Sequence, residues 1–197
     1  MEAVLRLYFL GFYGIGLLVF AIKVVPASLR VERIERRVDG FARWLPPALV
    51  FLNFVLPMVI LTTRVGELAV RWVPMRILGI VVSVYAAAML LSAAATLGRF
   101  LVPQAIVVAD HQLVTRGPYR YVRHPAYSGD LALWLGAALA TVNVLLLVLW
   151  PLSVLGTHLQ ARREEQLLAA KFGADYEAYA RTSGHLFPRL GLRSQRP

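Results

Sequence analysis

The uncharged stretch "LALWLGAALATVNVLLLVLWPLSVLGT", Leu131 to Thr157, decides the fold of this chain. As a single helix it would be roughly 40 Å long at about 1.5 Å per residue, whereas the hydrocarbon core of a bilayer is about 30 Å thick. Near its middle, "ATVN" at Ala140 to Asn143 places a strongly polar side chain beside β-branched residues that weaken a helix. We therefore predict a helical hairpin that bends at Ala140 to Asn143.

Three further uncharged runs precede this stretch, and a membrane-spanning helix needs about 20 mostly apolar residues. They extend from Leu7 to Ile22, from Leu45 to Thr63 and from Ile77 to Gly98. The first run follows "MEAVLR", which is not the basic leader of a cleavable signal peptide, so we expect it to remain as the first helix.

The composition indicates a membrane protein, because 58% hydrophobic residues and a mean hydropathy of +0.62 are too high for a soluble globule of 197 residues. The alternating pattern of an outer-membrane barrel is absent, so helices must satisfy the backbone. We predict an all-α integral membrane protein with one domain, residues 1–197, and a cytoplasmic helical C-terminal tail. Its five transmembrane helices are predicted at about 5–25, 44–64, 75–98, 126–141 and 143–171.

The positive charges predict the orientation. With the N-terminus outside and a hairpin at the end of the bundle, most of the 21 Lys and Arg residues lie on the cytoplasmic side, together with the C-terminus. This pattern suits a bacterial-type inner membrane and the endoplasmic reticulum equally. Contact with membrane lipids accounts for the net charge of +10, so we expect no nucleic-acid partner. Because the chain has no cysteine, thiolate metal sites are excluded, and we expect no metal.

The stretch "RGPYRYVRHPAYSG", Arg116 to Gly129, concentrates cations and hydrogen-bond donors at the start of the hairpin. Pro125 biases His124 away from helical geometry, so a helix should begin at or just after Pro125, and its free amides suit a carboxylate. The carboxylates of Glu164 and Glu165 suit a cation. Together these groups predict a site for a small zwitterion. Taken singly, they fit headgroup anchors, an aromatic belt or a solvated helix face.

The combination of "RHPAYSG" at Arg123 to Gly129, "EEQLL" at Glu164 to Leu168 and "FGADYEAY" at Phe172 to Tyr179 resembles a known family. It is that of the integral-membrane isoprenylcysteine carboxyl methyltransferases, with phosphatidylethanolamine N-methyltransferase as a more distant relative. The resemblance covers about residues 100–190 and implies that this part binds S-adenosylmethionine. The cofactor contacts that it implies are Gln104, His111, Gln112, Leu113, Val114, Tyr119, His124, Pro125, Ala126, Tyr127, Glu164 and Glu165.

The resemblance also implies a lipid-like methyl acceptor that enters from the bilayer. We expect O-methylation of a prenylated cysteine carboxylate or a similar lipid acid, which is already ionised near neutral pH. The arginine that contacts substrate in the eukaryotic enzymes aligns with Gln160 here, so Arg163, one turn further along the helix, is predicted to replace it. Arg162 is the second candidate, and Arg123 completes the predicted catalytic set.

Other chemistry stays open at this point. An amine or thiol acceptor would need a base, for which His124 and Glu165 are candidates. An NADPH-dependent membrane sterol or lipid reductase and a non-enzymatic membrane scaffold are the alternative functions.

Overall fold

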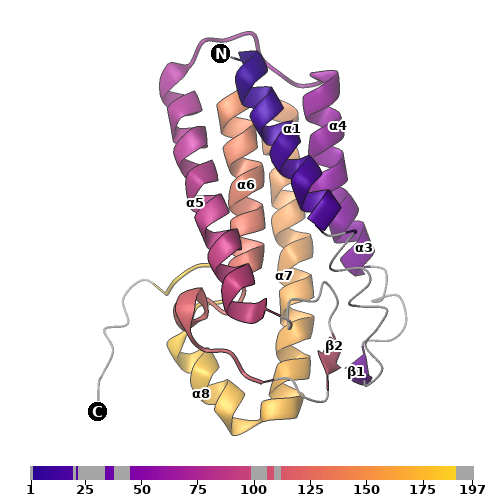
Figure 1. Cartoon of the computed structure of the whole chain (residues 1–197), viewed down its shortest axis with the longest axis vertical. Helices are drawn as coiled ribbons and strands as arrows, with labels where there is room; N and C mark the ends of the chain where they lie inside the picture. Colours follow the sequence, from indigo (N-terminus) through magenta and orange to yellow (C-terminus); the bar gives the residue numbers. More distant parts are fainter. Residues whose placement is uncertain are drawn as a thin grey trace.

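The computed structural model describes residues 2–19, 21, 34–37, 45–98, 106–108 and 112–189. Its long helices lie side by side in one bundle, with the N-terminus at one end and α8 at the other (Figure 1). A π-helical segment, η3 (Phe51–Val55), joins α3 to α4, and a 3-10 helix, η5 (Gly117–Arg120), precedes α6. The α-helices are α1 (Glu2–Val19), α3 (Leu45–Val50), α4 (Leu56–Thr63), α5 (Val73–Leu97), α6 (Pro125–Thr141), α7 (Val144–Phe172) and α8 (Ala174–Thr182).

The helical class that the sequence predicts is confirmed. Three helical segments of the described residues are long and apolar enough to cross a membrane, by length and composition. They are Leu45–Thr63, which combines α3, η3 and α4, then Val73–Leu97 (α5) and Val144–Phe172 (α7). The count of five crossings stays a prediction. The sequence reading did not predict the two short antiparallel strands β1 (Ile34–Arg37) and β2 (Ile106–Val108), because so few residues show no period that distinguishes a strand.

The predicted bend between the last two long helices is confirmed. Helix α6 ends at Thr141, and Val142 adopts a left-handed backbone conformation with a φ of 52°. Such a conformation costs an ordinary residue roughly 1–2 kcal/mol, so its surroundings must hold it. Asn143 does so, because its Oδ1 accepts a hydrogen bond from the Leu146 amide and its Nδ2 donates to the Val65 carbonyl, both at 3.0 Å. The polar residue in the middle of the apolar run is the N-cap of α7.

Helices α5 and α6 approach each other closely through small residues. A Cβ atom at Gly79 would lie 2.3 Å from the Ala140 nitrogen, and one at Gly136 would lie 2.2 Å from Ser83 Oγ. In a membrane the hydrophobic effect does not drive helices together, because lipid tails are also apolar. Small residues allow the helix backbones to approach closely, so that van der Waals packing holds them together. This contact fixes the register of α6 against α5 and thereby the place in the bundle where the first turn of α6 lies.

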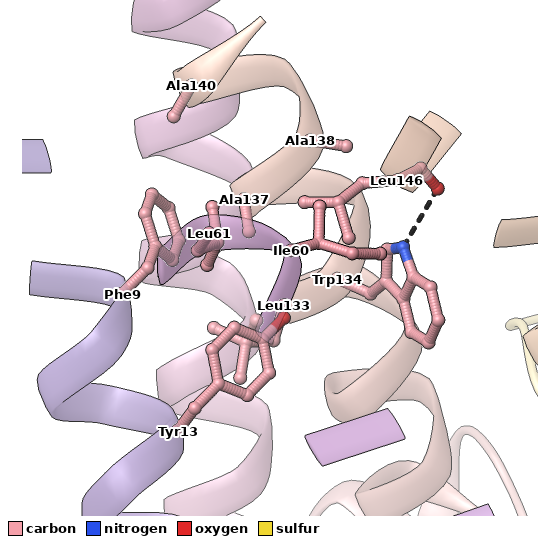
Figure 2. Close-up of a cluster of buried hydrophobic side chains, with 11 residues drawn as sticks. Phe9, Tyr13, Ile60, Leu61, Leu133, Trp134, Ala137, Ala138, Ala140 and Leu146 are labelled. Atoms are coloured by element: carbon pink, nitrogen blue, oxygen red, sulfur yellow. Dashed lines mark hydrogen bonds between the residues drawn. The ribbon is translucent and has the colours of Figure 1, made fainter. Parts of the chain in front are cut away.

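The buried apolar cluster lies in the half of the bundle near the hairpin turn. Figure 2 shows Phe9 and Tyr13 of α1 beside residues of α4 and α6. Trp134 Nε1 donates a hydrogen bond to the Leu146 carbonyl at 2.9 Å, which satisfies the indole inside the core. The other members are Ile60, Leu61, Ala86, Leu133, Ala137, Ala138 and Ala140.

Two ion pairs, called the far-end ion pairs below, brace the end of the bundle that carries the hairpin turn. Arg6 Nη2 lies 2.8 Å and 2.6 Å from the two carboxylate oxygens of Glu67. Arg76 is 1% exposed, and its Nη2 donates to Glu2 at 2.8 Å while its Nη1 donates to the Ala140 carbonyl at 3.0 Å. These contacts tie α1, α5, α6 and the turn after α4 together.

Candidate active site

The segment before α6 and the segment after α8 lie side by side at the opposite end of the bundle. Val122 and Gly184 form a parallel bridge, and the Arg123 amide donates to the Gly184 carbonyl at 2.8 Å. The His124 amide donates to the His185 carbonyl at 3.3 Å. The prediction that this loop and the tail meet on one face is therefore confirmed.

Helix α6 begins at Pro125, as predicted, with His124 as its N-cap residue. The His124 side chain makes no capping bond and is 7% exposed. Its ring instead stacks on Tyr127, with 5.6 Å between ring centroids and 15° between planes. The Ser128 hydroxyl donates to the Leu186 carbonyl, which fastens the tail to the first turn of α6. The start of α6 thus presents His124 and Tyr127 to α7.

Glu164, on α7, receives its partners from two helices and from the loop before α6. Its Oε1 accepts hydrogen bonds from the Tyr127 hydroxyl at 2.5 Å and from Gln160 Nε2 at 3.1 Å. His124 Nδ1 lies 3.6 Å from its Oε2, which is longer than a hydrogen bond. This second oxygen can therefore accept a further donor.

Glu165, the next residue, collects three nitrogen donors on one oxygen. Its Oε1 lies 2.5 Å from Arg123 Nε, 2.8 Å from His185 Nδ1 and 3.3 Å from His124 Nε2. Arg123 also donates to the carbonyls of Ala180 and Ser183, so this guanidinium joins the tail to α7. We call Glu164 and Glu165 with these side-chain partners the carboxylate cluster.

The pKa values of the two histidines in the cluster are shifted in opposite directions. Burial alone would lower the pKa of His124, but its close polar contacts with Glu164 and Glu165 and the negative charges of these two carboxylates outweigh burial, so the pKa is raised. Burial lowers the pKa of His185, and repulsion from His124 and His158 adds to this effect, so contact with Glu165 offsets it only in part. His124 therefore carries the positive charge more readily than His185.

Three tyrosines around the cluster stay neutral at ordinary pH. Burial raises the pKa of Tyr179 to about 12 and the pKa values of Tyr119 and Tyr176 further. The Tyr179 hydroxyl donates to the Tyr119 carbonyl at 2.7 Å. Because their pKa values are raised, the three phenols do not serve as bases near neutral pH.

One set of groups in the cluster has the spacing of metal ligands. The ligand atoms of His124, Glu165 and His185 all lie within 4.8 Å of one another. The Glu165 oxygen that they share also accepts the hydrogen bond from Arg123, and the charge of this guanidinium opposes a second cation. We assign no metal to this set.

A cavity of about 170 Å³, called the polar cavity below, lies beside the cluster among α3, η3, α5, α6 and α7. Tyr127 and Gln160, the two donors to Glu164 Oε1, form part of its wall. Its other polar wall residues are Asn53, Asp130 and Thr157. The remaining wall is apolar: Pro46, Leu49, Val50, Phe54, Leu90 and Ala126.

A second hollow, of about 460 Å³, lies on the opposite flank of the cluster. His158 and His185 border it, and His185 Nε2 lies 3.1 Å from His158 Nδ1. The rest of its wall is apolar: Pro151, Val154, Leu155, Leu186 and Phe187. The carboxylate cluster thus has an apolar-walled space on either side.

The structure brings together only part of the predicted site. Tyr127, His124, Glu164 and Glu165 contact one another, and Pro125 and Ala126 lie at the start of the same helix. Tyr119 is 8% exposed, and the negative charge of Glu164 contributes to its raised pKa. Gln104 and His111 lie outside the described residues.

The other predicted residues lie apart from the cluster. Gln112, Leu113 and Val114 precede η5, and none of them hydrogen-bonds to the carboxylate cluster among the described contacts. Arg162 is exposed and Arg163 is partly exposed. Neither arginine reaches the carboxylate cluster or lines the polar cavity among the described contacts.

Sequence reasoning missed two residues of this site. His185 stands in "SGHLFP", which reads as an irregular tail, and only the pairing of this segment with the "RHP" loop brings it to Glu165. Asp130 reads as one charge within an apolar run, and its position facing α7 could have been suspected from its spacing of three residues after Tyr127.

These features define a helical membrane protein with a buried, ionisable site at one end of its bundle. The chain belongs to the phospholipid methyltransferase family, because the sequence model of this family matches residues 73–175, more than half of the chain. The match includes α5, α6, α7 and all of the carboxylate cluster except His185. The family resemblance inferred from the sequence is thereby confirmed.

Two curated relatives carry a more specific name. Each is called "probable protein-S-isoprenylcysteine O-methyltransferase", one from Oryza sativa subsp. indica and one from Oryza sativa subsp. japonica. Both are 41% identical to this chain over 73 residues, which is 36% of this chain and 38% of the relative. The chain therefore matches well under half the length of these relatives.

Proposed function

We propose that this protein transfers a methyl group from S-adenosylmethionine to a lipid-like acceptor at the membrane. The observation that carries the proposal is the carboxylate cluster, which lies within the region matched by the family. Arg123 neutralises Glu165, whereas His124 is the one cationic partner that Glu164 has among the described residues. A ligand ammonium would complete the pairing of Glu164.

The residues present fit this cofactor. Glu164 Oε2 would accept the amino group, since Tyr127 and Gln160 already hold Oε1 in place. The first turn of α6 has no side-chain cap, so its free amides would receive the carboxylate group. When bound, S-adenosylmethionine supplies a methyl group on a positively charged sulfur, which an acceptor atom attacks in line.

The cluster favours an acceptor that needs no proton removed. The pKa of His124 is raised by its two carboxylate neighbours, so the ring is less available to accept a proton than a free histidine is. Glu165 Oε1 is occupied by three donors. We therefore propose O-methylation of a carboxylate, in which the new O–CH3 bond replaces the S–CH3 bond. The carboxylate of a prenylated cysteine is the first candidate, in keeping with the names of the two relatives.

The arginines take different roles in this proposal. We propose Arg163, with Arg162 second, to orient the acceptor carboxylate, because Arg163 lies one turn beyond Gln160. Arg123 positions Glu165, since its other bonds go to backbone carbonyls. Arg163→Ala should raise the acceptor KM and leave the affinity for S-adenosylhomocysteine unchanged. Unchanged KM and kcat would show that another group orients the acceptor.

We propose a multi-pass topology with the N-terminus outside and the carboxylate cluster on the cytoplasmic face. A water-soluble cofactor would approach from the cytoplasm and a lipid acceptor from the bilayer. The absence of cysteine allows a direct test, because single cysteines can be placed at exposed Glu177 and Leu68, at opposite ends of the bundle. In sealed vesicles, an impermeant maleimide should label Glu177→Cys from the cytoplasmic side alone and Leu68→Cys from the other. The reverse pattern would overturn this orientation.

Ligand-dependent thermal stability tests the cofactor. The detergent-solubilised protein is titrated with S-adenosylhomocysteine and, separately, with NADPH. A ligand that binds the folded state raises the melting temperature by mass action. S-adenosylhomocysteine should raise it in a concentration-dependent manner and NADPH should not. A response to NADPH alone would favour the reductase, and a response to neither would favour the scaffold.

A further inference from the structure

Asp130 is a buried carboxylate inside the bundle that the proposed methyl transfer does not use. It lies on α6, three residues after Tyr127, and is 9% exposed. The Asn53 amide interacts with it, but Asp130 Oδ1 accepts no hydrogen bond from any described residue. An ionisable side chain at such a depth is costly, and residues of this kind usually serve a ligand or a transport path.

A second polar atom in the same cavity also has no partner. Thr157 of α7 is 1% exposed, and its Oγ1 makes no hydrogen bond within the described part of the chain. Asp130 and Thr157 both line the polar cavity. Two buried polar atoms without hydrogen-bond partners, Asp130 Oδ1 and Thr157 Oγ1, on one cavity indicate a group that the cavity receives.

The part of the cavity wall that η3 forms also carries a polar side chain held in a fixed orientation. Asn53 lies in the π-helical segment η3, and such bulges often occur at functional sites. Its Oδ1 accepts a hydrogen bond from the Ser153 hydroxyl at 2.5 Å, which orients the amide. The cavity walls include no Lys, Arg or His among the described residues. A cation that pairs with Asp130 would therefore have to come from a bound group.

The cavity also has the position that an acceptor requires. It reaches Tyr127 and Gln160, which hold Glu164, so it adjoins the proposed cofactor end of the site. Its remaining wall is apolar and suits a hydrocarbon chain. A lipid bound in it would place its polar head between Asp130 and the carboxylate cluster.

We propose that the polar cavity is the head-group site for the methyl acceptor and that Asp130 binds a nitrogen donor, an ammonium or an amide N–H, on that head group. This inference rests on the proposed function and narrows its substrate class. The acceptor is a lipid that carries nitrogen beside the methylated atom, as a prenylated cysteine does. A simple fatty acid is a poor ligand, because its carboxylate would lie near the Asp130 carboxylate.

Binding of a matched pair of simple lipids tests the assignment without assuming the acceptor. The full chain, in phosphatidylcholine nanodiscs saturated with S-adenosylhomocysteine, is titrated with dodecylamine and with dodecanoic acid, and the melting temperature is followed. Dodecylamine should stabilise the protein at concentrations roughly tenfold to a hundredfold lower than the acid, as a charge-assisted bond predicts. Equal or tighter binding of the acid would overturn the proposal.

Variants test whether Asp130 causes the preference for dodecylamine over dodecanoic acid. Asp130→Asn keeps the shape but removes the charge, so it should abolish the preference for dodecylamine while S-adenosylhomocysteine still binds. Thr141→Val is the matched control, since Thr141 is buried on the same helix and bonds only to its own helix, at Ala137. It should keep the preference. If Asp130→Asn keeps it too, Asp130 is not the receptor; if the variant does not fold, the comparison in the original chain still decides.

Turnover gives an independent measurement. S-farnesylcysteine and S-farnesylthiopropionic acid share the prenyl chain and the carboxylate, but the second lacks nitrogen. The original chain should show a kcat/KM at least about tenfold higher for S-farnesylcysteine. Equal values would contradict the proposal. Failure of S-adenosylhomocysteine to bind, in contrast, would refute the proposed methyltransferase and not the choice of head group.

Discussion

The two ends of the helical bundle both bury arginine against carboxylate, yet they are arranged differently. At the far end, each arginine has one carboxylate, as in the pair of Arg6 and Glu67, and no histidine takes part among the described residues. At the other end, Glu164 and Glu165 are adjacent, and among the described contacts Arg123 pairs with Glu165 alone. A buried ion pair by itself therefore does not mark a functional site. In the proposed function, adjacent carboxylates in excess over permanent cations leave charge for a ligand.

Breaking a far-end ion pair should give the largest change in stability. Arg6→Met leaves Glu67, which is 13% exposed at its side chain, without its cation. Removing one partner of a buried pair costs about 3–5 kcal/mol of unfolding free energy. Chemical unfolding in mixed micelles measures the loss, and Arg6→Met combined with Glu67→Gln should recover much of it. A loss of equal size in the double variant would show that packing, not charge, carries the effect.

Removing the charge of Glu164 should instead affect the ligand. Glu164→Gln is expected to weaken S-adenosylhomocysteine binding roughly tenfold to a hundredfold, since a hydrogen bond to a charged group contributes about 1.5–3 kcal/mol. Isothermal titration gives the dissociation constant. The melting temperature without ligand should change little. Glu177→Gln, on an exposed position of α8, is the matched control and should bind as the original chain does.

The pH dependence of stability should separate the two ends further. The pKa of His124 is raised, so its contribution to stability is complete below the unfolded value of about 6.5 and is lost as pH rises through the folded pKa. The difference in unfolding free energy between the original chain and His124→Gln should therefore shrink as pH rises. For His185→Gln, whose native residue has a lowered pKa, the trend should be opposite. The effect of Arg6→Met should be flat across this range. If both histidine variants showed the same trend with pH, the opposite pKa shifts of His124 and His185 would be contradicted.

The smallest expected effect comes from Tyr127→Phe, which removes one of two donors to Glu164 Oε1 and leaves Gln160 in place. A net hydrogen bond contributes about 0.5–1.5 kcal/mol, so binding of S-adenosylhomocysteine should weaken roughly twofold to tenfold. Isothermal titration again measures it. A loss as large as that of Glu164→Gln would mean that Tyr127 contacts the ligand itself.

Much of the fold follows from hydropathy alone. The length of the last apolar run and the polar Asn143 within it predict the hairpin, because a bilayer limits how long one helix can be. Pro125 fixes the start of α6 for a local reason, its missing amide hydrogen. These signals depend on a few neighbouring residues and can be read without the fold.

The unpredicted parts of the site depend on contacts between distant segments. His185 reaches Glu165 only because the tail pairs with the loop before α6, and nothing in "SGHLFP" signals such pairing. Asp130 and Asn53 meet across two helices whose packing angle the sequence does not state. The prediction of Arg163 rests on the family arginine that aligns with Gln160 and on the helical spacing from it, and spacing along one helix cannot tell which neighbour that face meets.

The parallel bridge between Val122 and Gly184 has a consequence for where the functional unit ends. The family match stops at residue 175, within α8, and a protein shortened after Thr182 would still contain every long helix. It would nevertheless lose the carbonyls that receive the amides of Arg123 and His124, along with His185 itself. Proteolysis after Thr182, which is exposed, should therefore abolish the activity of the protein and leave its long helices intact.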